Sequence, residues 1–370
     1  MLTRYAVTWR LPRTPYGSPP SSSGLNTAPP NSAMCAVLDW SKEHEPTLAI
    51  RLAGASFELF NGLALLHESR RRSDLLYSLL PSLSAPLEGE ARFLRMRSLH
   101  MRDVSLDAQL DLATQSAALY RKQGDARGLY EALAAVIQCF QTFPTVANAA
   151  WDEMAGLVDE SWPPALRALI WISRSKIARI GNRLSEKRGA LEAALPLVVQ
   201  SGADRLTMVV LANLADHVLL TVEIDEAVQR GLELTSLLRR RRRHAQLPLA
   251  LANLANALLQ QGNAARARQA LTEAFAEMRA LQWNWLRGVG DVYALLAARE
   301  GRVTNAARLL GWADSVRKQR GERQPNEARC RALAMQDVAA ALEGREIARL
   351  MSFDVDMDAE SVHDLTLCSS

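Results

Sequence analysis

The chain has 370 residues, 48% of them apolar, which is enough for two ordinary domains or one elongated repeat array with a substantial core. The formal net charge of +4 is small for this length, which argues against a dedicated nucleic-acid binder. The four scattered cysteines include no C-x-x-C pair, so a disulfide framework or structural zinc site is disfavoured and a reducing cytoplasm is favoured. No apolar run approaches the roughly 20 residues that span a bilayer, and we expect no membrane partner.

Residues 1–33 are expected to form a disordered leader. The tract Leu11–Ser32 is rich in proline and serine, so it favours neither a regular helix nor a buried core. The segment also lacks the continuous apolar centre of a secretory signal. Two alternatives stay open. Translation could start at Met34, or the segment could be a transit peptide, which its prolines disfavour because they disrupt an amphipathic helix.

From Met34 onward, apolar residues recur at helical spacing almost without interruption, and no alternating run carries hairpin chemistry. Each periodic segment covers about 14 to 20 residues, an ordinary helix length. Glycines and prolines separate these segments. Because the connections are short, successive helices should pack antiparallel.

The middle of the chain repeats itself. The segments "LANLADHVLL" (Leu211–Leu220) and "LANLANALLQ" (Leu251–Gln260) share their first five residues at an offset of 40 residues. Downstream, Gly262 and Gly301 are 39 residues apart. These glycines permit a left-handed turn between the two helices of a hairpin.

A second repeating position follows each turn. Ala227, Ala267 and Ala306 are spaced by 40 and 39 residues and should line the second helix of each hairpin. An earlier unit is expected to have its turn at Gly181 and its alanine at Ala190. One hairpin cannot bury its apolar faces alone, so stacked hairpins should make a continuous core.

The pattern resembles a degenerate tetratricopeptide repeat, with a period slightly longer than the usual ~34 residues. The predicted fold class is therefore all-α: a right-handed α-solenoid of antiparallel helix hairpins, with a non-repeating helical bundle as the alternative. We expect N-terminal helical repeats over 34–160, tetratricopeptide-like repeats over 161–322 and C-terminal capping helices over 323–370.

Both ends of the helical region carry a further resemblance. The start reads Val37–Trp40 (VLDW), Glu43–Pro46 (EHEP) and Leu48–Gly54 (LAIRLAG), and the end contains Asn305–Glu343 and Asp358–Leu367. In this order, these segments resemble the helical-repeat region of large bacterial ATP-binding transcriptional regulators. Those regulators are signal-transduction ATPases with LuxR-type, SARP-type or OmpR-type DNA-binding domains, the maltose-regulator type among them.

In that family the region follows an ATPase module and a winged-helix subdomain. The ATPase needs G-x-x-x-x-G-K-[ST], whose backbone amides cradle phosphates, and this sequence holds no such string and no convincing helix-turn-helix pair. The resemblance therefore implies the sensing arm of a regulator. A protein, peptide or small effector would bind this chain, whereas ATP and DNA would bind only through domains that it lacks.

The residues indicate no catalytic chemistry, and we expect a protein that is not an enzyme and uses no cofactor or metal. The acidic run Asp354–Glu360 does not fit an EF-hand, because Ala359 and Leu365 stand at the sixth and twelfth loop positions. No two of the six histidines have metal-ligand spacing on one helix, and no nucleophile elbow is present.

The run "RRRRRH" (Arg239–His244) has two interpretations. It could contact a phosphate or a nucleic acid. The favoured interpretation is a helix C-terminus whose positive side chains complement the helix dipole and stay solvated. The same interpretation applies to Arg70–Arg72.

A partner would bind the concave face, which in tetratricopeptide repeats comes from one stripe of each first helix. In this chain the expected stripe includes Ser175, Arg179, Asp216, Asn256 and Asp291. Asp216 and Asn256 occupy equivalent positions in successive units, so they should stack in line. For each residue, ordinary exposed helix surface is the alternative.

Two function classes follow. The chain is either the effector-sensing part of a transcriptional regulator, as a fragment or a stand-alone remnant, or a free-standing scaffold or adaptor unrelated to transcription. A third class, a nucleic-acid binder acting through Arg239–Arg243, predicts steeply salt-dependent binding.

Overall fold

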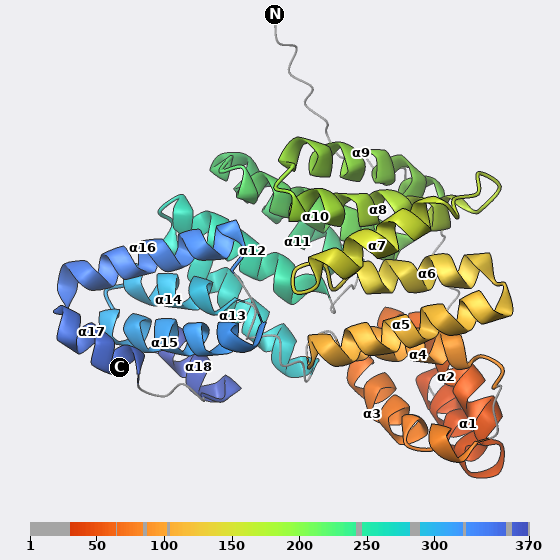
Figure 1. Ribbon diagram of the computed structural model, residues 1–370. Coiled ribbons are helices and arrows are strands. Elements are labelled where there is room, and N and C mark those ends of the chain that lie inside the picture. Colours follow the sequence, from red (N-terminus) through yellow and green to blue (C-terminus); the bar gives the residue numbers. More distant parts are fainter. Residues whose placement is uncertain are drawn as a thin grey trace, which may run out of the picture.

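The computed structural model describes residues 30–63, 65–83, 87–101, 104–241, 246–281, 289–320, 323–352 and 357–368. This part of the chain is helical, without a strand, and confirms the predicted all-α fold (Figure 1). The expected leader lies outside the described residues up to position 29. Helix α1 begins at Pro30, slightly before the expected boundary, because proline is tolerated in a first helical turn.

The helices follow one another in a row with short connections. In chain order they are α1 (Pro30–His44), α2 (Pro46–Gly62), α3 (Leu66–Tyr77), the 3-10 turn η1 (Leu80–Ser82), α4 (Glu90–Met101), α5 (Leu106–Gln123), α6 (Ala126–Ile137), α7 (Pro144–Ala155), α8 (Pro164–Ile180), α9 (Leu184–Gln200), α10 (Asp204–Leu220), α11 (Ile224–Arg240), α12 (Leu247–Gln260), α13 (Ala264–Ala280), α14 (Gly290–Arg299), α15 (Val303–Arg320), α16 (Pro325–Ala341), α17 (Gly344–Met351) and α18 (Ala359–Leu367).

Consecutive helices pack side by side along this row, which makes a helical-repeat solenoid (Figure 1). The repeat region consists of the hairpins α8–α9, α10–α11, α12–α13 and α14–α15. Helix α10 also contacts α12, and α12 contacts α14, so the first helices form one side of the stack. Helix α16 lies against this side and packs mainly on α14 and α15.

The four hairpin turns each place one residue in the left-handed region. These residues are Asn182 (φ 51°), Val222 (φ 65°), Gly262 (φ 87°) and Gly301 (φ 78°), spaced by 40, 40 and 39 residues. Gly262 and Gly301 have the predicted role. The turn expected at Gly181 is wrong by one residue, because Asn182 has the positive φ.

Because this turn lies one residue later than expected, a different residue occupies the repeat position in the second helix. The residue five positions after each turn is Lys187, Ala227, Ala267 or Ala306, and all four are buried. The repeat position in the first hairpin is therefore Lys187 and not the expected Ala190. Ala190 is also buried, but it belongs to the next turn of α9.

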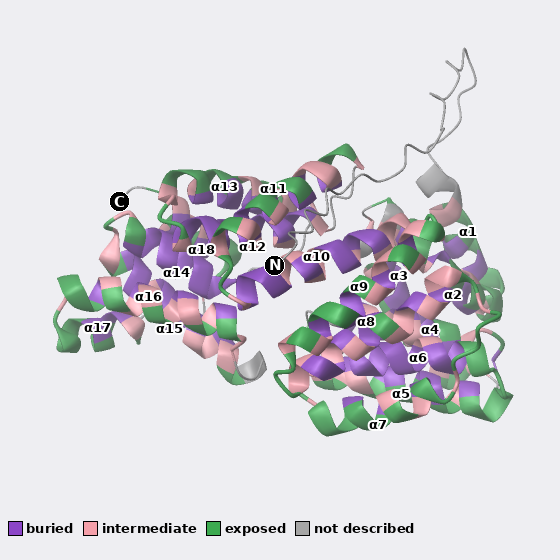
Figure 2. Cartoon of the chain, turned by 90° about the horizontal axis from the view of Figure 1, so that it is seen from above, coloured by how far each residue is buried: buried purple, intermediate pink, exposed green. Residues whose placement is uncertain are grey.

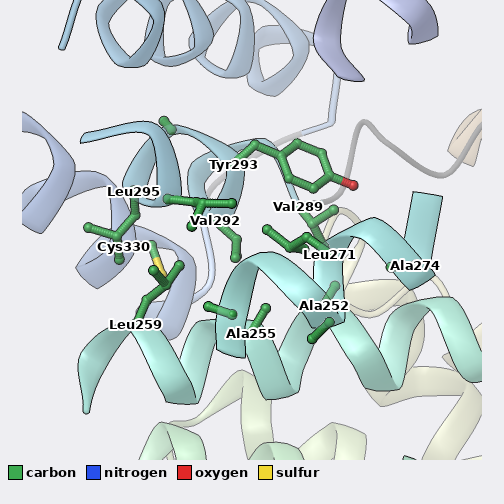
Figure 3. Close-up of a cluster of buried hydrophobic side chains, with 14 of the residues drawn as sticks. Ala252, Ala255, Leu259, Leu271, Ala274, Val289, Val292, Tyr293, Leu295 and Cys330 are labelled. Carbon is green, nitrogen blue, oxygen red and sulfur yellow. The ribbon is translucent and has the colours of Figure 1, made fainter. Parts of the chain in front are cut away.

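The largest apolar core runs through the C-terminal half, from α10 to α18. Figure 3 shows its centre, where Ala252 and Ala255 of α12 face Leu271 of α13 and Tyr293 of α14. Buried residues predominate along α12 and α14 (Figure 2). The N-terminal half holds one cluster centred on α2–α4 and one on α5–α8, and a smaller cluster joins α8, α9 and α10.

The C-terminal helices close the stack. Asp358 caps α18, since its side chain accepts from the amide of Ser361 at 2.8 Å. At the other end of α18, Arg302 donates to the carbonyls of Leu365 and Thr366 at 2.7 and 2.6 Å. These bonds satisfy carbonyls that a helix end leaves without partners. None of the described helices combines the length and the hydropathy that crossing a bilayer requires.

Candidate partner-binding face

One segment of the chain contacts four of the five residues predicted for the concave face. This segment is Arg323–Arg331, which leads into α16 and forms its first turns, and we call it the strap. The four contacted residues lie on α8, α10, α12 and α14, and we call them the inner face. The contacts are Arg179 with Gln324, Asp216 with Asn326, Asn256 with Cys330 and Asp291 with Arg323.

Asp216 is the centre of a charged cluster at the α8–α10 end of the inner face. Its Oδ2 accepts from Arg179 Nη1 at 3.2 Å and from Lys187 Nζ at 3.0 Å. Its Oδ1 accepts from Asn326 Nδ2 at 3.3 Å. The Lys187 side chain is only 3% exposed, so almost all of its solvation comes from these protein groups.

The electrostatics of this cluster are asymmetric because two cations share one carboxylate. Burial raises the pKa of Asp216, but the charges of Lys187 and Arg179 outweigh that effect and bring the pKa below its usual value. Burial lowers the pKa of Lys187, and Arg179 lowers it further against the opposing charge of Asp216. The strap adds only the neutral amides of Gln324 and Asn326. The cluster therefore carries an excess of positive charge.

Asn256 is the centre of a neutral cluster at the middle of the face. Its Oδ1 accepts from Cys330 Sγ at 2.9 Å and from Gln260 Nε2 at 2.6 Å. Cys330 points between α12 and α14 (Figure 3), and burial raises the pKa of its thiol. Arg329 donates to the carbonyl of Leu219 at 3.1 Å, at the end of α10. Asn256 thus fixes the first turns of α16 against α12.

Asp291 lies at the start of α14 and holds the beginning of the strap. Arg323 Nε donates to its Oδ2 at 3.0 Å, and Arg323 Nη2 donates to Asp314 Oδ1 at 2.5 Å. Arg331 also binds Asp314, with an Nη2–Oδ2 distance of 2.8 Å. Burial raises the pKa of Asp291 despite the adjacent Arg323 charge. Here the charges of the strap and the solenoid are matched.

Ser175 does not take part in this face. It is buried, and its hydroxyl donates to the carbonyl of Ile172 within α8 at 2.7 Å. Asp216 and Asn256, which were predicted to stack in line, both contact the strap. Asn256 is buried, whereas an exposed position was expected. The role of the set in binding a partner stays a prediction.

Sequence reasoning missed Lys187 and the strap. Lys187 had a detectable signal: with the register corrected, a lysine occupies a position that is alanine in the three following hairpins. A charged residue at a small, buried repeat position requires a partner, and Asp216 supplies it. The strap had no comparable signal, because its contacts join residues up to 145 positions apart.

The arginine runs are engaged in local ion pairs. Arg239 binds Glu273 with an Nε–Oε1 distance of 2.7 Å, and Arg241 reaches Asp204 at 3.5 Å. Residues 242–245 of the run lie outside the described residues. Arg72 binds Glu68 at 2.8 Å and also pairs with Asp39.

One group of described residues has the donor types of a metal site. His363, Asp364 and Cys368 place ligand atoms within 4.8 Å of one another near the end of α18. The Asp364 carboxylate already accepts from His363 Nδ1 at 3.1 Å and from Cys368 Sγ at 3.4 Å. Asp364 and Cys368 are exposed, and these internal bonds account for the arrangement.

The inner face thus makes hydrogen bonds and an ion pair with the strap. A comparison with models of known protein families found no match for the chain. A comparison with curated proteins also found no match.

Proposed function

We propose that this chain is a non-catalytic, cytoplasmic binding module that recognises a protein, peptide or small effector on its inner face. The observation that carries the proposal is the strap, whose side chains meet Arg179, Asp216, Asn256 and Asp291. Side chains that bind one peptide segment across several repeats have the spacing and chemistry to bind another.

We further propose that the module belongs to a bacterial transcriptional regulator of the LuxR-like, ATP-dependent type and that it serves in signal transduction. The support is the similarity at Val37–Gly54 and Asn305–Glu343, together with the first described helix. Val37 and Trp40 lie one turn apart on α1 and are 48% and 54% exposed. We propose that this apolar pair contacts a neighbouring domain.

The test is the intact mass of the endogenous protein, captured with an antibody against the repeat region. A mass well above the 40.8 kDa of this chain, with ATP and DNA binding by the whole protein, is the expected result. A mass of 40.8 kDa without ATP or DNA binding would contradict the regulator and favour a free-standing scaffold or adaptor.

The inner face has a separate test. Arg179→Gln combined with Asn256→Ser changes two inner-face side chains without burying a new charge, and it should weaken partner binding by the intact protein. Gln229→Lys on the exposed face of α11 is the matched surface control. Circular dichroism must show the same helical content in all variants. Unchanged binding in a folded double variant would remove the inner face from the proposal.

A further inference from the structure

The charge imbalance at Asp216 indicates what kind of partner the inner face accepts. Arg179 Nη1 and Lys187 Nζ both meet one oxygen of Asp216, at 3.2 and 3.0 Å. Lys187 is nearly inaccessible to water, so its charge is not screened by solvent. A second carboxylate beside Arg179 and Lys187 would balance their two positive charges.

In the strap, the neutral amide of Gln324 lies where such a carboxylate would bind Arg179. Gln324 Oε1 accepts from Arg179 Nη2, and Gln324 stands at the cap position just before α16. An amide oxygen accepts a hydrogen bond but brings no charge. A glutamate side chain has the same length and would add the missing negative charge.

The strap is also held unevenly along its length. From Cys330 onward, α16 buries the stripe Cys330, Ala334 and Val338 in the apolar core. Gln324 is only half-buried, and its side chain makes one contact with the inner face. Residues 324–326, of which Asn326 is buried, can therefore leave the inner face only as a short unit, while Arg323 stays on Asp291 and α16 from Cys330 onward stays packed.

Resting on the function proposed above, we infer that residues 324–326 are an internal ligand which an acidic peptide displaces. The partner's glutamate or aspartate binds Arg179 in place of Gln324, and its negative charge offsets the positive charge of the nearby Lys187. The strap thereby keeps the face closed to neutral peptides, and a carboxylate at the right position opens it.

The test uses two synthetic peptides of residues 323–329, one with the native sequence and one with Gln324→Glu, because α16 of the protein itself keeps the sites of the later residues filled. Both are titrated against the full chain carrying Gln324→Ala and Asn326→Ala, which weakens the internal strap. The Gln324→Glu peptide should bind about tenfold more tightly, the effect of one close charge pair. Adding Lys187→Met to the protein should close most of that gap.

A second measurement uses the unaltered full chain. Saturating Gln324→Glu peptide should increase amide hydrogen exchange in residues 324–330, and exchange in α14 should stay unchanged. This result would show displacement of the strap.

The unfavourable outcomes are distinguishable. Equal affinities of the two peptides would overturn the acidic partner while leaving peptide binding on the inner face intact. No binding of either peptide to the folded Gln324→Ala, Asn326→Ala protein would contradict both this inference and the inner face in the proposed function.

Discussion

The first and third hairpins of the repeat region differ at one buried position, and the difference separates packing from recognition. In α13, Ala267 is fully buried within the largest apolar core. In α9, the equivalent Lys187 is just as inaccessible but ends in an ion pair with Asp216. An alanine lets two helices approach, whereas a lysine requires a carboxylate on the neighbouring helix. The first hairpin therefore has an ion pair beside the strap at a position where the third hairpin has apolar packing.

Ala267→Lys should reduce the stability of the protein most severely. The position equivalent to Asp216 in α14 is Leu295, so the new ammonium group would meet no carboxylate there. Burying an unpaired charge and overfilling the core should destabilise the protein by at least ~4 kcal/mol. Urea denaturation followed by circular dichroism measures the loss. Ala267→Met serves as the control for side-chain volume, and an equal loss in both variants would show that charge is not the cause.

Asp216→Ala should have the next largest effect. It leaves Lys187 and Arg179 buried without their shared carboxylate, and removing one partner of such a group costs about 3 to 4 kcal/mol. Lys187→Met, by contrast, leaves the Arg179–Asp216 pair and should change stability by less than about 1 kcal/mol. Both values come from urea midpoints. Equal losses in the two variants would contradict the asymmetry of the cluster.

His100 in the N-terminal half is also a buried ionisable group, but hydroxyl groups contact it in place of an opposite charge. It lies between two serines, with Nε2 3.3 Å from Ser69 Oγ and Nδ1 3.2 Å from Ser73 Oγ. Burial, helped by the charges of Arg70 and Arg97, lowers its pKa to about 4. The neutral ring is thus the form that the fold accepts.

The lowered pKa predicts a pH dependence. The unfolded chain protonates His100 near pH 6.5 and the folded chain only near pH 4, so the unfolded state binds more protons in this window. Stability should therefore fall as pH decreases from 6.5 to 4, by about 3 kcal/mol in total. Unfolding free energies at several pH values should show this slope. His100→Gln should lack it, and an unchanged slope in that variant would assign it to other groups.

The hairpin turns give the smallest predicted effect. Val222 has a φ of 65° where the two following hairpins have glycine, and its side chain is 54% exposed. A left-handed backbone destabilises a β-branched residue by about 1 to 2 kcal/mol. Glycine avoids this strain, but it loses more conformational entropy on folding, which cancels roughly 0.5 to 1 kcal/mol of the gain. Val222→Gly should therefore stabilise the fold by about 0.5 to 1 kcal/mol, seen as a higher Tm.

Val222→Ala is the matched control for this prediction. Alanine keeps the Cβ that makes a left-handed residue unfavourable, so it should gain less than glycine. An alanine variant as stable as the glycine variant would show that the loss of the branched side chain, and not backbone strain, explains the result.

The fold class could be predicted from the sequence, because helical periodicity and the 40-residue offset are local signals. Gly262 and Gly301 have the predicted left-handed conformation, and Ala227, Ala267 and Ala306 are buried as expected. The register of the first hairpin was harder to predict. Asn182 has a positive φ without being glycine, so the neighbouring Gly181 drew the prediction one position away.

The contacts of the inner face could not be predicted from the sequence and are visible only in the folded chain. The resemblance to tetratricopeptide repeats led to a predicted stripe of Ser175, Arg179, Asp216, Asn256 and Asp291, of which all but Ser175 contact the strap. It does not reveal that a segment more than 30 residues beyond the last of them folds back over all four. Such contacts depend on the curvature of the whole stack, which accumulates from small differences in helix packing and has no signature in any single repeat.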